Sequence, residues 1–173
     1  MTGLDSRPKK DRAIIGIIIF FLVVAWTVEF YWLFYHRGLP RYDCLGRLWA
    51  VYGESDRGYC HPVSPFSLAL EGFHVFATTW LHVWLLYAIL RRAYYRHALQ
   101  LSVSSYIVYS VVLYFLVAHL SGYSGMSRHD WRRFTIFFGA NLPWLLGSGY
   151  MVYDSITAIN ARLRQEAESE RCR

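Results

Sequence analysis

Four long apolar runs constrain this chain of 173 residues more than any other feature. They cover residues 13–35, 66–90, 98–120 and 134–153. Each run has roughly 20 to 25 residues, and a helix that rises ~1.5 Å per residue can then cross a hydrocarbon core of ~30 Å. The sequence therefore predicts an all-α fold: a polytopic membrane protein with a bundle of four transmembrane helices.

The remaining segments are short, which leaves no room for a separate soluble domain. We expect a cytosolic N-terminal segment at 1–12, one membrane domain at 13–159 and a cytosolic tail at 160–173. Eleven of the 18 Lys and Arg residues flank the membrane end that carries both termini, so the positive-inside rule places the termini in the cytosol. Anionic lipid attracts such residues, and the net charge of +6 therefore requires no nucleic-acid partner.

Two of the runs contain a carboxylate. Glu29 is the only charge in the first run and Glu71 the only charge in the second, whereas the other two runs have none. An acid at such a position is costly in lipid and indicates a functional site. Counted from the membrane end opposite the termini, both lie about 8 to 9 Å deep, and Asn141 lies at about 10 Å, with Trp144 one turn deeper. We therefore expect one polar layer.

The second helix extends this polar layer along one face. Glu71, His74, Thr78 and His82 share that face at helical spacing. Two acids held close in a dry site cannot both ionise, so one remains protonated near neutral pH and can donate its proton. His74 is expected to relay that proton or orient Glu71, the alternative being an ordinary core histidine. His82 lies too deep toward the cytosol to join the layer.

Aromatic side chains should line a cavity around these acids. Trp144 offers an indole face to a positive centre, or else packs as an ordinary tryptophan. On the third helix, Ser102, Tyr106 and Tyr109 form a stripe, and we assign Tyr106 and Tyr109 to the substrate-binding wall, although hydrogen bonding between helices is the alternative. The long loop 36–65 should cap this end of the bundle, and Pro143 should kink the fourth helix beside Asn141.

Motifs for other chemistries are weak. The sequence has no HExxH and no paired CxxC, so we expect no metal and no cofactor. Haem ligation is disfavoured because His74 lies about 12 Å deep whereas His119 lies near a helix end. The GYSGM stretch around Ser124 lacks the second glycine of a nucleophile elbow. Two of the three cysteines fall in the long loop, and they either form a disulfide in an oxidising compartment or remain free thiols: Cys44 and Cys60.

Several stretches are similar to a known family. LWAVYGESDRGY at 48–59, ALEGF around Glu71, RHALQLSVSSYIVYSVVLYFLVAH at 96–119 and FFGANLPWLL at 137–146 occur in order and at the family's spacing. Together with Glu29 in WTVEFYWLFY, they resemble the emopamil-binding-protein family, whose four-span module is called the EXPERA domain. The resemblance covers about residues 24–159.

This resemblance implies a sterol isomerase of the endoplasmic reticulum membrane that works without a cofactor. Members move a ring double bond through a carbocation, by protonating one alkene carbon and removing a proton elsewhere, and they bind cationic amphiphilic drugs that mimic the cation. By the same resemblance, Glu29 and Glu71 match the acid/base carboxylates. Asn141 matches the polar orienting residue, and Trp144 matches the indole that faces the cation.

Departures from the family's pattern indicate altered chemistry. Ala25 stands in place of a histidine and His74 in place of a threonine, while Ile107, Val111 and Ala118 replace Gln, Asp and Glu. The family's sterol isomerase also has one further span before the four that match. We therefore expect a specialised relative, an isomerase or cyclase acting on a sterol or terpenoid, with Glu71 as proton donor, directly or through His74.

An alternative reading is a non-catalytic lipid binder of the same module, like its sigma-2 branch, in which the acids pair with a ligand amine or shape a cavity. The loss of polar groups from the third helix favours this alternative. In either case the expected partners are the membrane and a polycyclic lipid, and assembly as a homodimer is left open.

Overall fold

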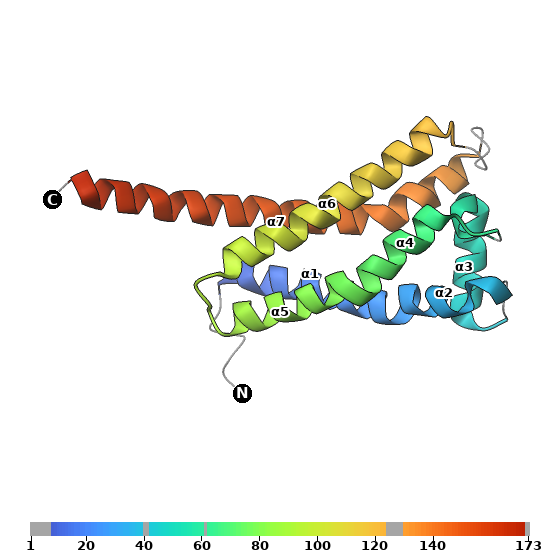
Figure 1. The fold of residues 1–173 in the computed structure, drawn as a ribbon, viewed down its shortest axis with the longest axis horizontal. Coiled ribbons are helices and arrows are strands. Elements are labelled where there is room, and N and C mark those ends of the chain that lie inside the picture. Colours follow the sequence, from blue (N-terminus) through green and yellow to red (C-terminus); the bar gives the residue numbers. More distant parts are fainter. Residues whose placement is uncertain (1–7, 40–41, 61, 124–129, 172–173) are drawn as a thin grey trace.

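The computed structural model describes residues 8–39, 42–60, 62–123 and 130–171. Within these ranges the chain forms helices and connecting turns and no strand, which confirms the all-α prediction (Figure 1). Residues 1–7 of the predicted N-terminal segment, Ser124 and Cys172 lie outside the described residues.

The first two apolar runs each form a helix that contains a π-helical turn. The first comprises α1 (Lys9–Val24), η1 (Ala25–Glu29), α2 (Phe30–Tyr35) and the 3₁₀ turn η2 (His36–Gly38). The second comprises α4 (Pro65–Phe73), η4 (His74–Thr78) and α5 (Thr79–Leu90). Pro65 occupies the first turn of α4, where its fixed φ suits a helix and its missing N–H costs nothing.

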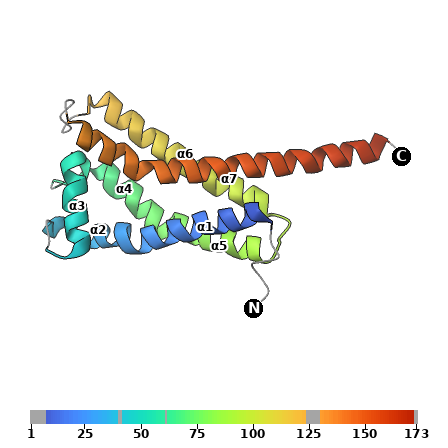
Figure 2. The same cartoon turned by 180° about the vertical axis from the view of Figure 1, so that it is seen from behind.

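The other two runs form α6 (Arg96–Leu120) and α7 (Trp131–Arg171), which pack against each other. Gln100 fixes their register, because its Nε2 donates to the Met151 carbonyl at 2.9 Å and to Asp154 at 3.2 Å. Helix α7 runs without interruption through Pro143, and its last turns project beyond the bundle (Figures 1 and 2). We call the end with both termini the tail end and the opposite end the loop end.

Three helical stretches in the described ranges are long and apolar enough to cross a membrane: Lys9–Gly38, Pro65–Leu90 and Arg96–Leu120. They match the first three predicted spans. The fourth run lies within α7, but Asn141, Pro143 and three glycines lower its hydropathy, and the helix then continues into a charged tail. That α7 also spans the membrane, and that the termini are cytosolic, stay predictions.

The long loop folds over the loop end of the bundle as α3 (Cys44–Ser55) and the 3₁₀ turn η3 (Arg57–Tyr59). Helix α3 lies across the direction of the spans and contacts α7 (Figures 1 and 2). Asp43 caps its N-terminus by accepting from the Gly46 N–H at 2.8 Å, and the Tyr31 hydroxyl donates to the same carboxylate. The expected cap over this end is confirmed.

Cys44 and Cys60 are free and exposed thiols in this structure. The Cys60 Sγ donates to the Gly53 carbonyl at 3.2 Å. Of the two alternatives left open by the sequence, the structure therefore has free thiols.

The buried side chains form two clusters with different chemistry. The tail half of the bundle holds an aliphatic cluster with Phe21, Ile18 and Leu85 at its centre. The loop half holds an aromatic cluster, which consists of Trp32, Trp49, Tyr59, Tyr114 and Phe137. Trp144 packs against the first cluster and Val28 against the second, so the polar layer lies where the two meet.

The N-cap of α3 gives a test of the fold. Replacing Asp43 by Ala removes the acceptor for Gly46 N–H and should destabilise the protein by about 1 kcal/mol, since the cap satisfies an otherwise unpaired amide. In detergent, thermal unfolding should shift down by about 2 to 4 °C. Asp43→Asn keeps an acceptor oxygen and should unfold near the wild-type temperature; an equal loss in both variants would contradict the cap.

Candidate active site

Two π-helical turns place the central residues of the polar layer. Glu29 is the last residue of η1 and His74 is the first residue of η4. These turns contact each other in the bundle. A π turn re-aims the side chains around it and is often found at functional sites. The two turns therefore bring a carboxylate from the first span against an imidazole from the second.

Glu29 and His74 form a hydrogen-bonded pair. The Glu29 Oε2 and the His74 Nδ1 lie 2.6 Å apart, in the range of a charge-assisted bond. Glu29 is buried, with 6% of its surface exposed. The sequence predicts that His74 relays the proton of Glu71 or orients its carboxyl. The structure gives the hydrogen bond of His74 to Glu29 and not to Glu71, while the ligand atoms of His74 and Glu71 still lie within 4.8 Å, so the relay role stays a prediction.

Glu71 has a different partner, which the sequence analysis missed. The Tyr59 hydroxyl donates to Glu71 Oε1 at 2.5 Å. Tyr59 comes from η3, at the end of the cap, and is buried. It stands in the LWAVYGESDRGY stretch, so the motif carried a signal, but a loop tyrosine twelve residues away could not be placed on Glu71 without the fold.

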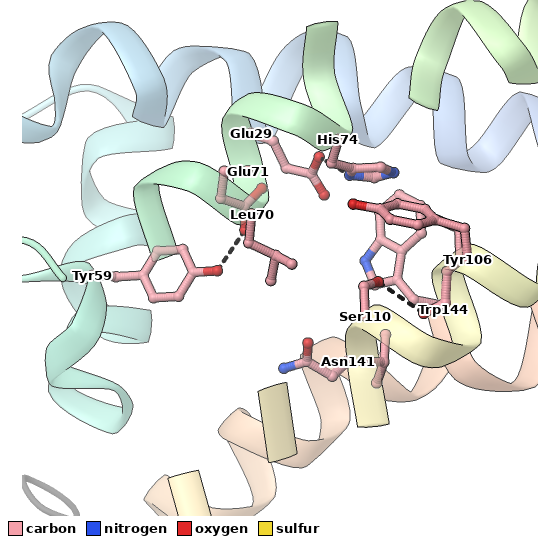
Figure 3. Close-up of a pocket in the computed structure, with 11 residues that line it drawn as sticks. Glu29, Tyr59, Leu70, Glu71, His74, Tyr106, Ser110, Asn141 and Trp144 are labelled. Atoms are coloured by element: carbon pink, nitrogen blue, oxygen red, sulfur yellow. Dashed lines mark hydrogen bonds and ion pairs between the residues drawn. The ribbon is translucent and has the colours of Figure 1, made fainter. Parts of the chain in front are cut away.

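The three ionisable groups lie together. The ligand atoms of Glu29, Glu71 and His74 are all within 4.8 Å of one another. This spacing permits proton exchange among them, and in composition the set could also hold a metal ion. The predicted layer with both acids is therefore formed (Figure 3). The His74 Nε2 is buried and has no hydrogen-bond partner among the described residues, which leaves it available for a further proton or ligand.

An open hollow of about 430 Å³ surrounds these groups on the side of α6. Most of the wall is apolar or aromatic, and the acids, His74 and Asn141 provide polar groups (Figure 3). The lining residues include the two acids, Tyr59, Leu70, His74, Tyr106, Ile107, Ser110, Val111, Asn141 and Trp144.

A second open hollow, of about 560 Å³, lies on the side of α3. It shares five lining residues with the first hollow: Glu29, Tyr59, Glu71, Asn141 and Trp144. The acids therefore face space on two sides. We treat the two hollows as one candidate site, divided by the shared residues.

Most of the predicted site residues are brought together. Asn141, Trp144 and Tyr106 line the first hollow. Tyr109 does not: it is 62% exposed, and it lines neither hollow. The rotation of α6 about its axis explains this. Ile107 and Ser110 lie on the face of the helix that lines the site, whereas Tyr109 lies on an exposed face. His82 is fully buried against Phe21 and lines neither hollow, as expected.

Asn141 and Trp144 are held by neighbours. The Asn141 Nδ2 donates to the Phe137 carbonyl at 2.8 Å and to the Tyr52 hydroxyl at 3.3 Å. Its amide oxygen is therefore left for another donor. The Trp144 ring stacks on Phe21, with 4.2 Å between centroids, and meets the His74 ring edge-on at 4.7 Å. These contacts fix both side chains at the wall of the site.

Asp56 stabilises the turn that carries Tyr59. Its carboxylate accepts from the Gly58 N–H at 2.8 Å, in the loop outside the apolar runs. Burial raises the pKa of Asp56 from 3.8 to about 6, and the Gly58 hydrogen bond only partly opposes this. The position of Tyr59 thus depends on a residue whose charge changes at mildly acidic pH.

Comparison with known proteins gives the family. The model of EXPERA (EXPanded EBP superfamily) matches residues 44–155, which is more than half of the chain. The chain belongs to the EXPERA family. Glu71, His74, Asn141 and Trp144 lie inside the matched region, and Glu29 lies before it.

One curated EXPERA relative is the 3-beta-hydroxysteroid-Delta(8),Delta(7)-isomerase of Rattus norvegicus. It is 33% identical over an alignment of 137 residues, and the match covers 75% of this chain and 57% of the rat protein. The chain thus spans just over half the length of that relative. The comparison confirms the family that the motifs indicated.

The pH dependence of stability should report on Asp56. Its folded pKa lies above the ordinary value, so the folded state holds its proton more tightly between pH 3.8 and about 6. The stabilisation from this group is complete below that window and is lost as the pH rises through it. Asp56→Asn keeps an acceptor for Gly58 and should remove this decline, giving a higher unfolding temperature than wild type at pH 7. Identical pH profiles of the two proteins would contradict the assignment.

Proposed function

We propose that this EXPERA protein is a membrane-embedded isomerase or cyclase that converts a polycyclic sterol or terpenoid by acid-initiated carbocation chemistry. The observation that carries the proposal is the cluster of Glu29, Glu71 and His74, with its ligand atoms within 4.8 Å, in a hollow walled by aromatic and aliphatic side chains. The rat relative, named as a steroid isomerase, supports the class of reaction.

The partners of the two acids suggest their roles. An imidazolium beside Glu29 would stabilise a negative charge there more strongly than the neutral Tyr59 hydroxyl does at Glu71. Two carboxylates this close in a dry site share one proton, so the proton belongs on Glu71. Glu71 is then the acid and Glu29 the base, each ready near neutral pH.

The reaction follows from these roles. Glu71 gives its proton to one alkene carbon of the substrate, and the positive charge develops on the other carbon. In a cyclase, the π electrons of a second alkene in the substrate then form a ring bond to that carbon, and the charge passes to the far carbon of the second alkene. A C–H bond next to the cation then supplies the electrons of the new double bond, and its proton passes to Glu29. The two acids return to the starting state by proton exchange through His74, which lies beside both.

The walls of the site suit a hydrophobic substrate that passes through a carbocation. Trp144 lines both hollows beside the acids, and an aromatic ring attracts a positive centre. The Asn141 amide oxygen can accept from a substrate hydroxyl. Ile107 and Val111 make part of the α6 wall apolar at two positions where the family's sterol isomerase has polar residues, which supports a substrate other than that enzyme's own.

The same apolar wall supports a second candidate function, a lipid-binding protein without catalysis. Substrate panels separate the two candidates. Membranes that contain the protein are incubated with a 3β-hydroxy-Δ8-steroid and with polycyclic terpenoids that carry a ring alkene, and the lipids are analysed by mass spectrometry and NMR. A rearranged product supports the enzyme, whereas saturable binding with every lipid unchanged supports the binder.

The first mutational test concerns the proton donor. Glu71→Gln keeps the shape of the side chain and removes the transferable proton, so product formation should fall by at least about 10²-fold, as for loss of a general acid. Asp154→Asn is a matched control, because Asp154 is a buried acid on α7 that lines none of the site. It should turn over at the wild-type rate. Turnover by Glu71→Gln at that same rate would remove Glu71 from the mechanism.

The second test concerns the cation. Trp144→Phe keeps an aromatic ring with a weaker attraction for positive charge, and a loss of about 1 to 2 kcal/mol corresponds to about 5- to 30-fold in kcat. Trp84→Phe serves as the control, since Trp84 lies half-exposed on α5 away from the site. Binding of an uncharged substrate analogue should change little in both. Equal kcat values for the two variants would argue against a cation beside Trp144.

A further inference from the structure

Tyr59 stands between the acids and a third hollow. This third hollow opens at the loop end, holds about 1390 Å³ and is lined by polar and charged residues that include His36, Glu54, Arg57 and Arg133. Tyr59 is the one residue that lines all three hollows described here. Trp49 lines the second and the third. The boundary between the acids and a polar surface is therefore aromatic.

Ring packing and hydrogen bonds hold this boundary in place. The Tyr59 ring stacks on Trp49, with 5.4 Å between centroids and 15° between planes, and packs 4.7 Å from Trp32. The Trp49 Nε1 donates to the Val28 carbonyl at 2.9 Å, and the Trp32 Nε1 to the Tyr59 carbonyl at 3.4 Å. All three aromatic residues are buried, and the Tyr59 hydroxyl is fixed on Glu71. We call Tyr59 and Trp49 the aromatic barrier.

A barrier at this place matters for carbocation chemistry. A site that forms a reactive intermediate must keep water away from it, because water would capture the intermediate before the intended step. The third hollow is lined mainly by residues of the loop 36–65, among them the charged Glu54 and Arg57, so it is accessible to water. Burial and the neighbouring Glu71 raise the pKa of Tyr59, so the barrier stays uncharged and apolar over the physiological range.

We propose that Tyr59, supported by Trp49, is the water barrier of the site, and that opening it converts the isomerase or cyclase into a hydratase. This inference rests on the proposed function. In the opened site Glu71 protonates the alkene as before. A water oxygen from the third hollow then bonds to the cation, and the resulting oxonium loses a proton to Glu29. The net reaction adds one water across the double bond and yields an alcohol.

Four variants test the barrier, and two of them separate the role of the Tyr59 ring from that of its hydroxyl. Tyr59→Ala opens the barrier. Tyr59→Phe keeps the ring and removes only the bond to Glu71, so it should slow turnover without changing the product. Tyr114→Ala is the matched control: it deletes a buried aromatic ring from the same cluster, but Tyr114 lines none of the three hollows. Trp49→Leu removes the second aromatic ring of the barrier.

The product assay is run in ¹⁸O-labelled water with the substrate that the wild type converts. In Tyr59→Ala and Trp49→Leu the share of labelled alcohol in the product should rise by at least about ten-fold, which is about 1.4 kcal/mol in partitioning. Wild type, Tyr59→Phe and Tyr114→Ala should give the rearranged alkene. If the wild type converts its substrate and the opened variants still form no labelled alcohol, the barrier is refuted; if the wild type converts nothing, it is the proposed function that fails.

A second readout does not require turnover. A water-soluble carbodiimide reaches carboxyl groups only through water, and mass spectrometry locates the residue that it modifies. Glu71 should be protected in wild type and in Tyr114→Ala, and modified several-fold faster in Tyr59→Ala and Trp49→Leu. Equal protection in all four folded proteins would overturn the barrier. If one opened variant fails to give a monodisperse peak in gel filtration, the other provides the comparison.

Discussion

The site depends on one interaction, the bond between the Glu29 carboxylate and the His74 imidazole across two spans. A lone carboxylate in a membrane would face a desolvation cost that no neighbouring lipid offsets. Pairing it with an imidazole keeps that cost low and holds the first two spans in a fixed rotation. Both residues lie in π-helical turns, and a regular helix would direct the two side chains elsewhere.

From that pair the rest of the site follows. Glu71 is left as the second acid beside the Glu29–His74 pair, and the Tyr59 hydroxyl from the cap donates a hydrogen bond to it. Asn141 and Trp144 close the wall from α7, held by Tyr52 and Phe21. The polar layer is thus assembled from the helices of the first two apolar runs, α7 and one loop. Its hydrogen bonds between elements join Glu29 to His74, Tyr59 to Glu71 and Asn141 to Tyr52, so the layer contributes to the packing of the bundle.

The cap lies between the candidate site and the polar hollow at the loop end. Helix α3 and η3 bring Trp49 and Tyr59 over the acids, and the same residues face the polar hollow at the loop end. Under the proposed function, the first two hollows take the hydrophobic substrate, and the aromatic barrier separates the acids from the polar third hollow. An enzyme that forms a carbocation needs this separation. Asp56 and Asp43, which hold the ends of the cap, therefore act on the site without touching it.

The sequence by itself determined the helical class, three of the membrane spans and the meeting of Glu29 with Glu71, because apolar length and helical rise convert directly into depth. The family motifs identified Asn141 and Trp144. Only the tertiary structure decided which partner each acid takes, since helical spacing puts His74 and Glu71 on one face but does not show which groups of other elements face them. It also excluded Tyr109 from the site and placed Tyr59 in it, because helix rotation and the path of a loop are set by packing between elements that are distant in the sequence.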